Sequence, residues 1–333
     1  MRYLAIAAAL MIAACSPGVQ VANAESASVK ASPVQRCVNL GGSLEGPSEG
    51  EWGYTVRRAD FKRIKEAGFD TIRLPVKWSG HTAKDKPYTI DPDFMARVKE
   101  IADWAIEADL QIIIDVHHFD ALMERPEAQR PRLGAIWRQI SEAFEGAPDN
   151  VIFELINEPR DKMTVRKTDS VNRELLAIIR EKHPDRWVIV GSAGWGSLEA
   201  LLKSRPPKDD RIILTFHNYD PYDFTHQGAF FANPPPPTGT RWGTRDDISR
   251  MKLGAKQARV FALEQGHPMF VGEFGVYEDV PLEQRAKWTR AFRETAEENG
   301  FGWCHWDFAT TFKIYNQDRE TWIHSMLGAL IDE

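Results

Sequence analysis

Residues 151–159 have the sequence VIFELINEP, a short and mostly apolar run that ends in Asn157, Glu158 and Pro159. Residues 111–118, QIIIDVHH, show the same pattern, with apolar residues followed by polar ones. A run of this length, without the alternation of a half-exposed strand, is typical of a strand that is buried on both faces, as in a parallel sheet. Both runs therefore predict inner strands of an α/β domain.

Six further runs of this kind place the eight predicted strands at about residues 36–40, 70–75, 111–116, 151–156, 187–192, 211–216, 269–273 and 301–306. Helical patterns separate them. In residues 91–108, for example, Phe94, Val98 and Ile101 lie at helical spacing after an Asp-Pro start signal. Eight strand–helix units over about 300 residues predict a closed (β/α)8 barrel, the TIM barrel.

A doubly wound sheet is the alternative α/β architecture, and it usually carries a G-x-G-x-x-G turn after its first strand. Residues 39–45, NLGGSLE, do not match that turn. The four prolines at 234–237 lie in the long connection after the sixth strand and predict a stiff loop rather than a domain linker. We find no internal repeat, and we expect a single barrel domain over residues 36–333.

The 333-residue chain has a formal net charge of −6, which comes from interspersed acidic and basic residues rather than from blocks. This pattern argues against nucleic acid or an anionic bilayer as the main partner. The chain also has 11 tryptophans, and because aromatic faces stack on the apolar faces of sugar rings, this count is compatible with a carbohydrate ligand. We therefore expect a neutral ligand and no nucleic-acid partner.

Residues 1–24 are predicted to be a targeting segment. Arg2 supplies a positive charge, and residues 3–14 form an apolar stretch that is too short to span a membrane as a helix. Residues 12–15, IAAC, resemble a bacterial lipobox in which Cys15 is lipidated, whereas residues 22–24, ANA, resemble an ordinary cleavage site. We favour the lipobox, because it directly follows the apolar run.

The small and polar residues 25–35 predict a short tether between the targeting segment and the barrel. We expect an exported protein: an outer-membrane or periplasmic lipoprotein if Cys15 is lipidated, and a periplasmic or secreted protein otherwise. The lipid anchor is the only membrane contact that we expect, and we expect a monomer.

If Cys15 is lipidated, two cysteines remain in the domain. Cys37 lies in the first predicted strand and Cys304 in the last, so they are neighbours if the sheet closes. We expect two buried thiols, because a disulfide needs a geometry that sequence does not supply, and the question of a bridge stays open.

In a barrel of this kind the active site lies at the carboxyl ends of the strands. The side chains at these ends are almost all polar or aromatic: Arg73 after the second strand, Asp115, His117 and His118 after the third, Asn157 and Glu158 after the fourth, His217 and Tyr219 after the sixth, Glu273 after the seventh and Trp306 after the eighth.

Glu158 and Glu273 end strands on opposite sides of the predicted barrel, so their carboxyls face each other across its mouth. One such glutamate alone would be read as an ion-pair partner or a helix cap. Two opposed carboxyls, with polar and aromatic side chains at the remaining strand ends, fit the hydrolysis of a glycosidic bond. A retaining enzyme needs one protonated carboxyl and one ionised carboxyl about 5–5.5 Å apart.

From about residue 36 to its end, the chain resembles glycoside hydrolase family 5, the cellulase family. The order and spacing of eight segments carry the resemblance: residues 45–53 EGPSEGEWG, 72–75 IRLP, 115–118 DVHH, 157–159 NEP, 217–219 HNY, 224–228 FTHQG, 272–275 GEFG and 303–306 WCHW. The similarity is greatest to endoglucanases with a comparable first loop, some of which also act on mannan or mixed-linkage glucan. No cofactor and no metal are implied.

The resemblance implies that Glu158 is the acid/base and Glu273 the nucleophile. It further implies that Arg73 binds the nucleophile and keeps it ionised, that Asn157 binds the sugar 2-hydroxyl, and that His117 contacts the sugar in the cleaved subsite. His217 and Tyr219 would orient the carboxylates.

Substrate-binding residues are also expected. Trp306 is the expected stacking surface under the distorted sugar, and Trp195 and Trp242 are expected to extend the cleft. For His118 a packing role competes with a substrate contact, because adjacent strand residues point in opposite directions. Gly42 stands where similar enzymes have Asn, which leaves Glu45 as the nearby polar group and leaves the choice between glucose and mannose open.

We therefore expect a retaining, endo-acting hydrolase of β-1,4-glucan, either cellulose or mixed-linkage glucan, with a β-mannanase or a xyloglucanase as alternatives. From other classes, a metal-dependent barrel hydrolase would use Asp115, His117, His118 and His217, but the chain lacks H-x-H on its first strand and HExxH. A carbohydrate-binding protein without activity would leave both carboxylates unexplained.

Overall fold

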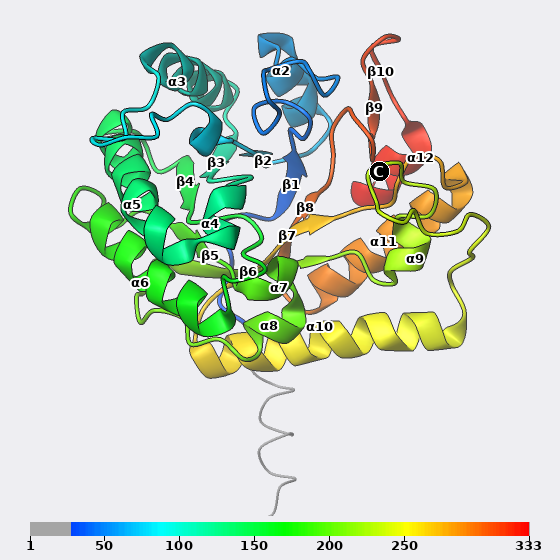
Figure 1. Cartoon of the computed structure of the whole chain (residues 1–333). Helices are drawn as coiled ribbons and strands as arrows, with labels where there is room; N and C mark the ends of the chain where they lie inside the picture. The colour runs from blue at the N-terminus through cyan, green and yellow to red at the C-terminus, as the bar shows by residue number, and fades with distance from the viewer. Residues whose placement is uncertain (1–27, 333) are drawn as a thin grey trace, which may run out of the picture.

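The structure is a computed structural model, and it describes residues 28–332. Its centre is a closed barrel of eight parallel strands that pair in sequence order, with the first also paired to the eighth (Figure 1). The strands are β1 (Arg36–Asn39), β2 (Thr71–Leu74), β3 (Gln111–Asp115), β4 (Val151–Glu154), β5 (Val188–Val190), β6 (Ile212–Asn218), β7 (Met269–Phe274) and β8 (Gly302–His305). The predicted (β/α)8 fold is confirmed.

Helices connect the strands and surround the barrel (Figure 1). They are α2 (Arg58–Glu66), α3 (Pro92–Glu107), α4 (Asp120–Glu124), α5 (Pro126–Ala143), α6 (Val165–Arg180), α7 (Ala193–Gly196), α8 (Leu198–Leu201), α9 (Tyr222–Thr225), α10 (Arg245–Gln265), α11 (Leu282–Glu298) and α12 (His324–Leu330), with a short 3-10 helix at Trp78–Gly80 and a small hairpin of β9 (Tyr315–Asn316) and β10 (Thr321–Trp322). Asp91 caps α3 as expected, because its side chain accepts from the backbone N–H of Asp93 at 2.9 Å.

The predicted targeting segment and Cys15 lie outside the described residues. Of the predicted tether, the described part runs from residue 28, and Ser32 and Val34 within it are buried. Within residues 28–332, no helix combines the length and the apolar character that a membrane crossing requires.

The lower part of the barrel interior is an apolar layer, here called the lower layer. It contains one inward side chain from each of seven strands together with Val34 from the N-terminal segment: Cys37, Ile113, Ile152, Ile189, Ile213, Phe270 and Cys304. All eight residues are fully buried. Val34 therefore closes the bottom of the barrel.

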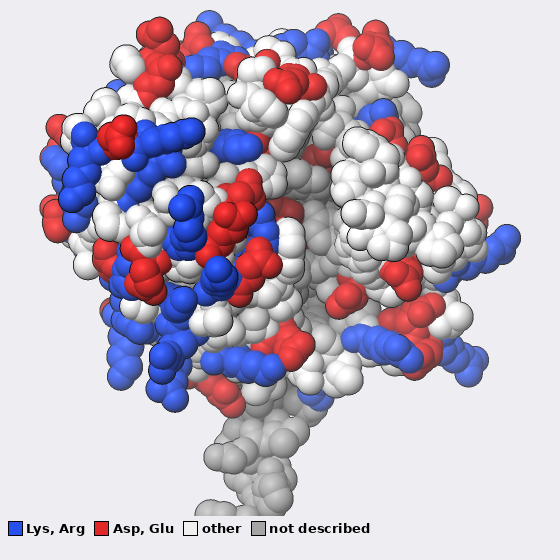
Figure 2. Space-filling view, viewed as in Figure 1, with Lys and Arg blue, Asp and Glu red and all other residues white. Residues whose placement is uncertain are grey.

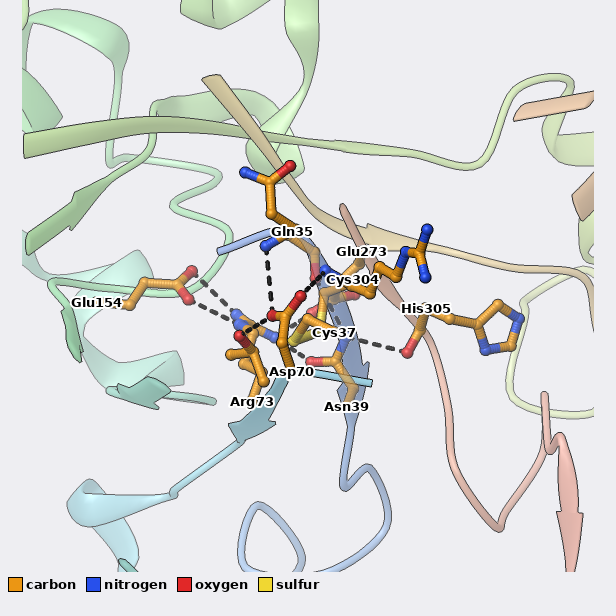
Figure 3. Close-up of a disulfide and its surroundings, with 12 residues drawn as sticks. Gln35, Cys37, Asn39, Asp70, Arg73, Glu154, Glu273, Cys304 and His305 are labelled. Atoms are coloured by element: carbon orange, nitrogen blue, oxygen red, sulfur yellow. Dashed lines mark hydrogen bonds and ion pairs between the residues drawn. A yellow bond between two sulfur atoms is a disulfide. The ribbon is translucent and has the colours of Figure 1, made fainter. Parts of the chain in front are cut away.

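Cys37 and Cys304 form a disulfide within the lower layer (Figure 3). The expectation of two free thiols was wrong. The two residues are direct register partners on the neighbouring strands β1 and β8, which brings their side chains together as soon as the barrel closes. Sequence indicated the two strands but not this register.

Two residues further along the strands, the interior becomes polar. Asn39, Arg73, Asp115 and Glu154 make up this upper layer, and all four are buried. Side chains at positions i and i+2 of a strand point to the same face, so Cys37 and Asn39 of β1 both enter the barrel, as do Ile152 and Glu154 of β4. The active-site face therefore rests on a polar layer, which in turn rests on an apolar one.

Candidate active site

Arg73 is the centre of the upper layer. Its guanidinium makes a bidentate pair with Glu154, at 2.7 and 3.0 Å, and also contacts Asp115 at 2.8 Å and Glu273 at 2.9 Å (Figure 3). Burial on its own would lower the pKa of Arg73, but the surrounding carboxylates hold that pKa well above its usual value. A permanently charged guanidinium is thus fixed beside the predicted nucleophile.

Glu154 was not singled out from the sequence, although it is the main partner of Arg73. The available signal was a charged residue within an otherwise apolar strand, at the same strand parity as the buried Ile152. Asn39 was also missed, and its side-chain oxygen accepts from Arg73 at 2.9 Å. Both residues hold Arg73 in place within the upper layer.

A chain of hydrogen bonds orients Asn157. The Asn157 oxygen accepts from Arg73 at 2.8 Å, and its amide nitrogen lies 3.1 Å from Nε2 of His117. The other ring nitrogen of His117, Nδ1, lies 2.6 Å from Asp115. Since the Asn157 amide donates, His117 accepts at Nε2 and donates from Nδ1, which is a neutral imidazole. Burial lowers the pKa of His117 well below its usual value, in agreement with this assignment.

Glu273, at the end of β7, has two fixed hydrogen-bond donors. Arg73 Nη1 donates to one carboxylate oxygen at 2.9 Å, and the Tyr219 hydroxyl donates to the other at 2.9 Å. The residue before Glu273 is Gly272. A side chain at this position would collide with His217, because an added Cβ would lie 2.8 Å from its Nε2 atom. The small residue lets the imidazole lie over β7.

Glu158 is held differently. Its carboxylate contacts Nδ1 of His217 at 2.8 Å, and the same nitrogen lies 3.5 Å from Glu273. Within residues 28–332, no arginine pairs with Glu158. The backbone of Glu158 is left-handed, with φ of 43°, an uncommon conformation for a residue with a side chain. The predicted acid/base thus has one neighbour that can exchange a proton with it, and the predicted nucleophile has two that donate.

The two glutamates lie close together. Three atoms lie within 4.8 Å of one another: a carboxylate oxygen of Glu158, a carboxylate oxygen of Glu273 and a ring nitrogen of His217. They face a cleft of about 1910 Å³, which Figure 2 shows as the hollow in the centre of this face. A glycosidic bond placed in the cleft can meet both carboxyls at once.

Burial raises the pKa of both carboxyls to about 7. For Glu158, Arg73 and Arg160 oppose this effect from a distance. For Glu273, His217, Arg73 and the Tyr219 hydrogen bond all oppose it, while the charge of Glu158 adds to it. Because each charge raises the pKa of the other carboxyl, the pair releases its first proton well before its second. The direct donors favour Glu273 as the group that ionises first.

Trp306 and His118 both line the cleft. The ring of Trp306 stacks on that of His117 with centroids 5.8 Å apart. The strand alternation expected for His118 does not apply, because β3 ends at Asp115 and His118 has a left-handed φ of 40°. Both histidines therefore reach the cleft.

Trp195 and Trp242 differ in exposure. Trp195 is 58% exposed, and the guanidinium of Arg160 lies over its ring at 4.3 Å. Trp242 also borders the cleft but is only 4% exposed, and it packs near Phe224. Trp242 thus offers a ligand little surface, and its predicted substrate contact stays a prediction.

Glu45 is buried, and its carboxylate accepts from the backbone amides of Gly42 and Ser43. Burial raises its pKa to about 8. Gly42 has a left-handed φ of 78°, and a side chain there would collide with Thr310, so an Asn would not fit this loop as it stands. Glu45 shapes the loop, and a direct contact with substrate stays a prediction.

The metal-site alternative used Asp115, His117, His118 and His217. Both ring nitrogens of His117 already have partners. Among the described residues, the only group with metal-compatible spacing is Glu158, His217 and Glu273, in which His217 already contacts each carboxylate. The described residues therefore do not bring the four residues of this alternative together as one metal-compatible group.

Comparisons with known proteins agree with this geometry. The family model "Cellulase (glycosyl hydrolase family 5)" matches residues 31–311. Endoglucanase H of Acetivibrio thermocellus is 35% identical over 88% of this chain and 32% of its own length, so the chain spans about a third of that relative. Endoglucanase A of Ruminococcus albus is 30% identical over 80% of this chain and 79% of its own length.

Solved structures agree as well. An endoglucanase of 38% identity superposes with a TM-score of 0.89, covering 90% of this chain and 97% of its own. Cel5A of Thermotoga maritima, solved with mannotriose, has 35% identity and a TM-score of 0.88 over the same shares. The fold and the opposed carboxylates define a barrel glycoside hydrolase. The chain belongs to glycosyl hydrolase family 5, the cellulase family.

Proposed function

We propose that this chain is an endo-β-1,4-glucanase that cleaves cellulose or mixed-linkage glucan and retains the anomeric configuration. The observation that carries the proposal is the spacing of Glu158 and Glu273, whose nearest oxygens lie within 4.8 Å of each other. Retaining glycosidases hold their carboxyls about 5–5.5 Å apart, whereas inverting enzymes leave about 6.5–9.5 Å for a water molecule.

In the proposed reaction, Glu273 attacks the anomeric carbon while Glu158 gives its proton to the departing glycosidic oxygen. The bond to the leaving sugar breaks, and a glycosyl ester forms on Glu273. Glu158, now ionised, then removes a proton from water, which attacks the same carbon and releases Glu273. Arg73 and Tyr219 hold the nucleophile ionised and in place, and Asn157 presents its amide to the sugar.

The pH dependence follows from the same pair. Activity needs one proton on Glu158 and none on Glu273, so kcat/KM rises as the first proton leaves the pair and falls as the second leaves. Burial raises the pKa of both groups to about 7, which places the active range around neutral pH.

The relatives support the choice of glucan, because those named above are endoglucanases. Mannan is the second candidate, since one Thermotoga maritima Cel5A structure contains mannotriose and another contains cellobiose. Gly42, which stands where similar enzymes have Asn, and the nearby Glu45 are the residues to examine for this choice.

The test is a panel of soluble glucan, mannan and xyloglucan, assayed for reducing ends and viscosity together. A rapid fall in viscosity per reducing end indicates internal cleavage, and the polymer with the highest kcat/KM identifies the substrate. Proton NMR of the first product from a cello-oligosaccharide should show the β-anomer before mutarotation. An initial α-anomer would overturn the roles of both glutamates.

We also propose that the protein is exported and anchored by a lipid on Cys15. The support is the sequence of residues 1–24 alone. The mature protein should partition into detergent, and Cys15→Ser should release a soluble form. A mature N-terminus at Glu25 would contradict the anchor.

A further inference from the structure

Helix α9 and its connection to α10 carry three exposed aromatic residues, among them Phe230, the most exposed large hydrophobic residue in the described part of the chain. Phe230 is 75% exposed, Phe231 48% and Tyr222 46%. Residues 224–240 contain no Asp, Glu, Lys or Arg. Figure 2 shows the resulting uncharged surface to the right of the central hollow. Exposed apolar patches of this kind usually mark a binding surface. We call Tyr222, His226, Phe230 and Phe231 the aromatic shelf.

The shelf is continuous with the reaction centre. Tyr219, which donates to Glu273, has its ring 5.0 Å from His226; His226 lies 6.0 Å from Phe231, and Phe231 lies 5.4 Å from Phe230. All of these residues line the cleft. Burial lowers the pKa of His226 to about 4, so this row of rings is uncharged at neutral pH. A polymer that lies in the cleft and extends beyond it on this side meets the shelf next.

The shelf is also held in one arrangement. The buried side chain of Gln227 donates to the carbonyls of Phe224 and Thr240, at 3.1 and 3.0 Å, and accepts from the backbone of Gly239 at 2.8 Å. The backbone N–H of Gly228 donates to the carbonyl of Pro236 at 2.8 Å. A surface fixed before binding loses less conformational entropy when a ligand arrives.

We propose that the aromatic shelf is a distal carbohydrate-binding site, at which Phe230 stacks on a sugar unit of a chain that is being cleaved in the adjoining cleft. This proposal rests on the proposed function. The apolar face of a pyranose covers a phenyl ring without requiring charge, and the absence of charged residues in this segment fits a neutral polymer better than a charged partner. Only chains long enough to reach from the carboxylates to Phe230 benefit from the site.

The test compares Phe230→Ala with wild type on substrates of different length. On amorphous cellulose and cellohexaose, kcat/KM should fall about threefold to tenfold, the size expected for the loss of one stacked ring. On an aryl β-cellobioside, which is too short to leave the catalytic subsites, the change should be less than about twofold. Leu253→Ala is the matched control, since Leu253 is 59% exposed on α10 and is not among the residues that line the cleft.

An equal loss on short and long substrates would overturn the proposal, because Phe230 would then act through the catalytic centre. Unchanged kcat/KM on every substrate would overturn it too. Sedimentation analysis completes the test: a wild-type dimer that Phe230→Ala converts to a monomer would identify the shelf as a self-association surface. The proposed function fails separately, in the wild type, if no β-1,4-linked polymer is cleaved.

Discussion

The lower and upper layers of the barrel interior lie two residues apart on the same strands, yet they differ in almost every physical property. The lower layer is apolar and contains a disulfide, with Ile113 and Ile152 among its members. The upper layer continues from these residues to Asp115 and Glu154, which surround a fully buried guanidinium. One set of strands thus separates packing from charge simply through the period of two of a β-strand.

This separation has an energetic consequence. A buried ion cluster is costly to desolvate, and it tolerates the loss of a partner poorly. An apolar layer beneath it excludes water and fixes the strands that carry the charges. Changes in the lower layer should therefore alter stability alone, whereas changes in or above the upper layer should alter activity, stability or their pH dependence.

The largest effect should come from the carboxyls above the upper layer. Glu273→Gln and Glu158→Gln should each lower kcat on a polymeric substrate on the order of a thousandfold or more, because each removes a group that makes or breaks a bond. Their unfolding midpoints should stay close to that of the wild type. Glu66→Gln, on the exposed face of α2, is the control. More than a tenth of wild-type turnover in either variant would contradict the assignment.

Removal of the Arg73 guanidinium should have the next largest effect. Arg73→Met leaves Glu154 and Asp115 buried without their partner, and the free energy of unfolding should fall by about 3–5 kcal/mol. Chemical unfolding measures this change. The same substitution at Arg58, which pairs with Glu107 at the surface with 68% and 54% of the two side chains exposed, should cost less than about 1 kcal/mol. A similar loss of unfolding free energy at both sites would contradict the expected difference between the buried and the exposed ion pairs.

In the lower layer, loss of the disulfide should lower stability without lowering activity. The double variant Cys37→Ala, Cys304→Ala should lose about 2–5 kcal/mol of unfolding free energy, because the bond constrains the unfolded chain over a long loop. At a temperature where the variant stays folded, its kcat/KM should equal that of the wild type. A marked loss of kcat/KM in the folded variant would show that the two layers are not independent.

The smallest effect should be a fall in stability from pH 7 to pH 9. Burial raises the pKa of Glu45 to about 8, so the folded chain keeps a proton that the unfolded chain has lost, and that stabilisation disappears as pH rises through 8. Burial lowers the pKa of His117 and of His217, so both are neutral in the folded state over this window. Histidines of the unfolded chain are largely neutral there as well.

The expected loss between pH 7 and pH 9 is about 1–2 kcal/mol. Urea unfolding across this range measures it, and Glu45→Gln should remove the larger part of the fall, leaving the smaller part that comes from Glu158 and Glu273, whose pKa burial raises to about 7. Glu66→Gln should leave the curve as in the wild type. A wild-type stability that rises over this range would show that the proton on Glu45 is not held as described.

Sequence was sufficient for the architecture, because eight apolar runs of strand length separated by helical patterns leave few alternatives to a closed barrel. The same pattern does not define where each strand ends. The predicted fourth strand reaches residue 156, but β4 ends at Glu154. Leu155 and Ile156 are buried although they do not belong to the strand. A buried residue after the end of a strand and a buried residue that pairs within the strand are both apolar, so a sequence does not distinguish them.

The site could be predicted as a set of residues but not as a network. The contact between Arg73 and Glu273, implied by the family resemblance, is present at 2.9 Å. The bidentate pair with Glu154 and the disulfide both depend on strand register, which a single sequence does not reveal. The left-handed backbone of His118 and the burial of Trp242 depend on loop packing, which follows no periodic pattern.

Cys37 and Cys304 are 267 positions apart in the sequence, and the bond between them closes the intervening chain into a covalent ring. All of the loops that border the cleft after β1 and before β8 belong to this ring. Exposed loop tips are where proteases cut, and a single cut in a ring leaves one covalent molecule whose two new ends cannot separate. A second cut within the ring is needed before any strand of the barrel can be released.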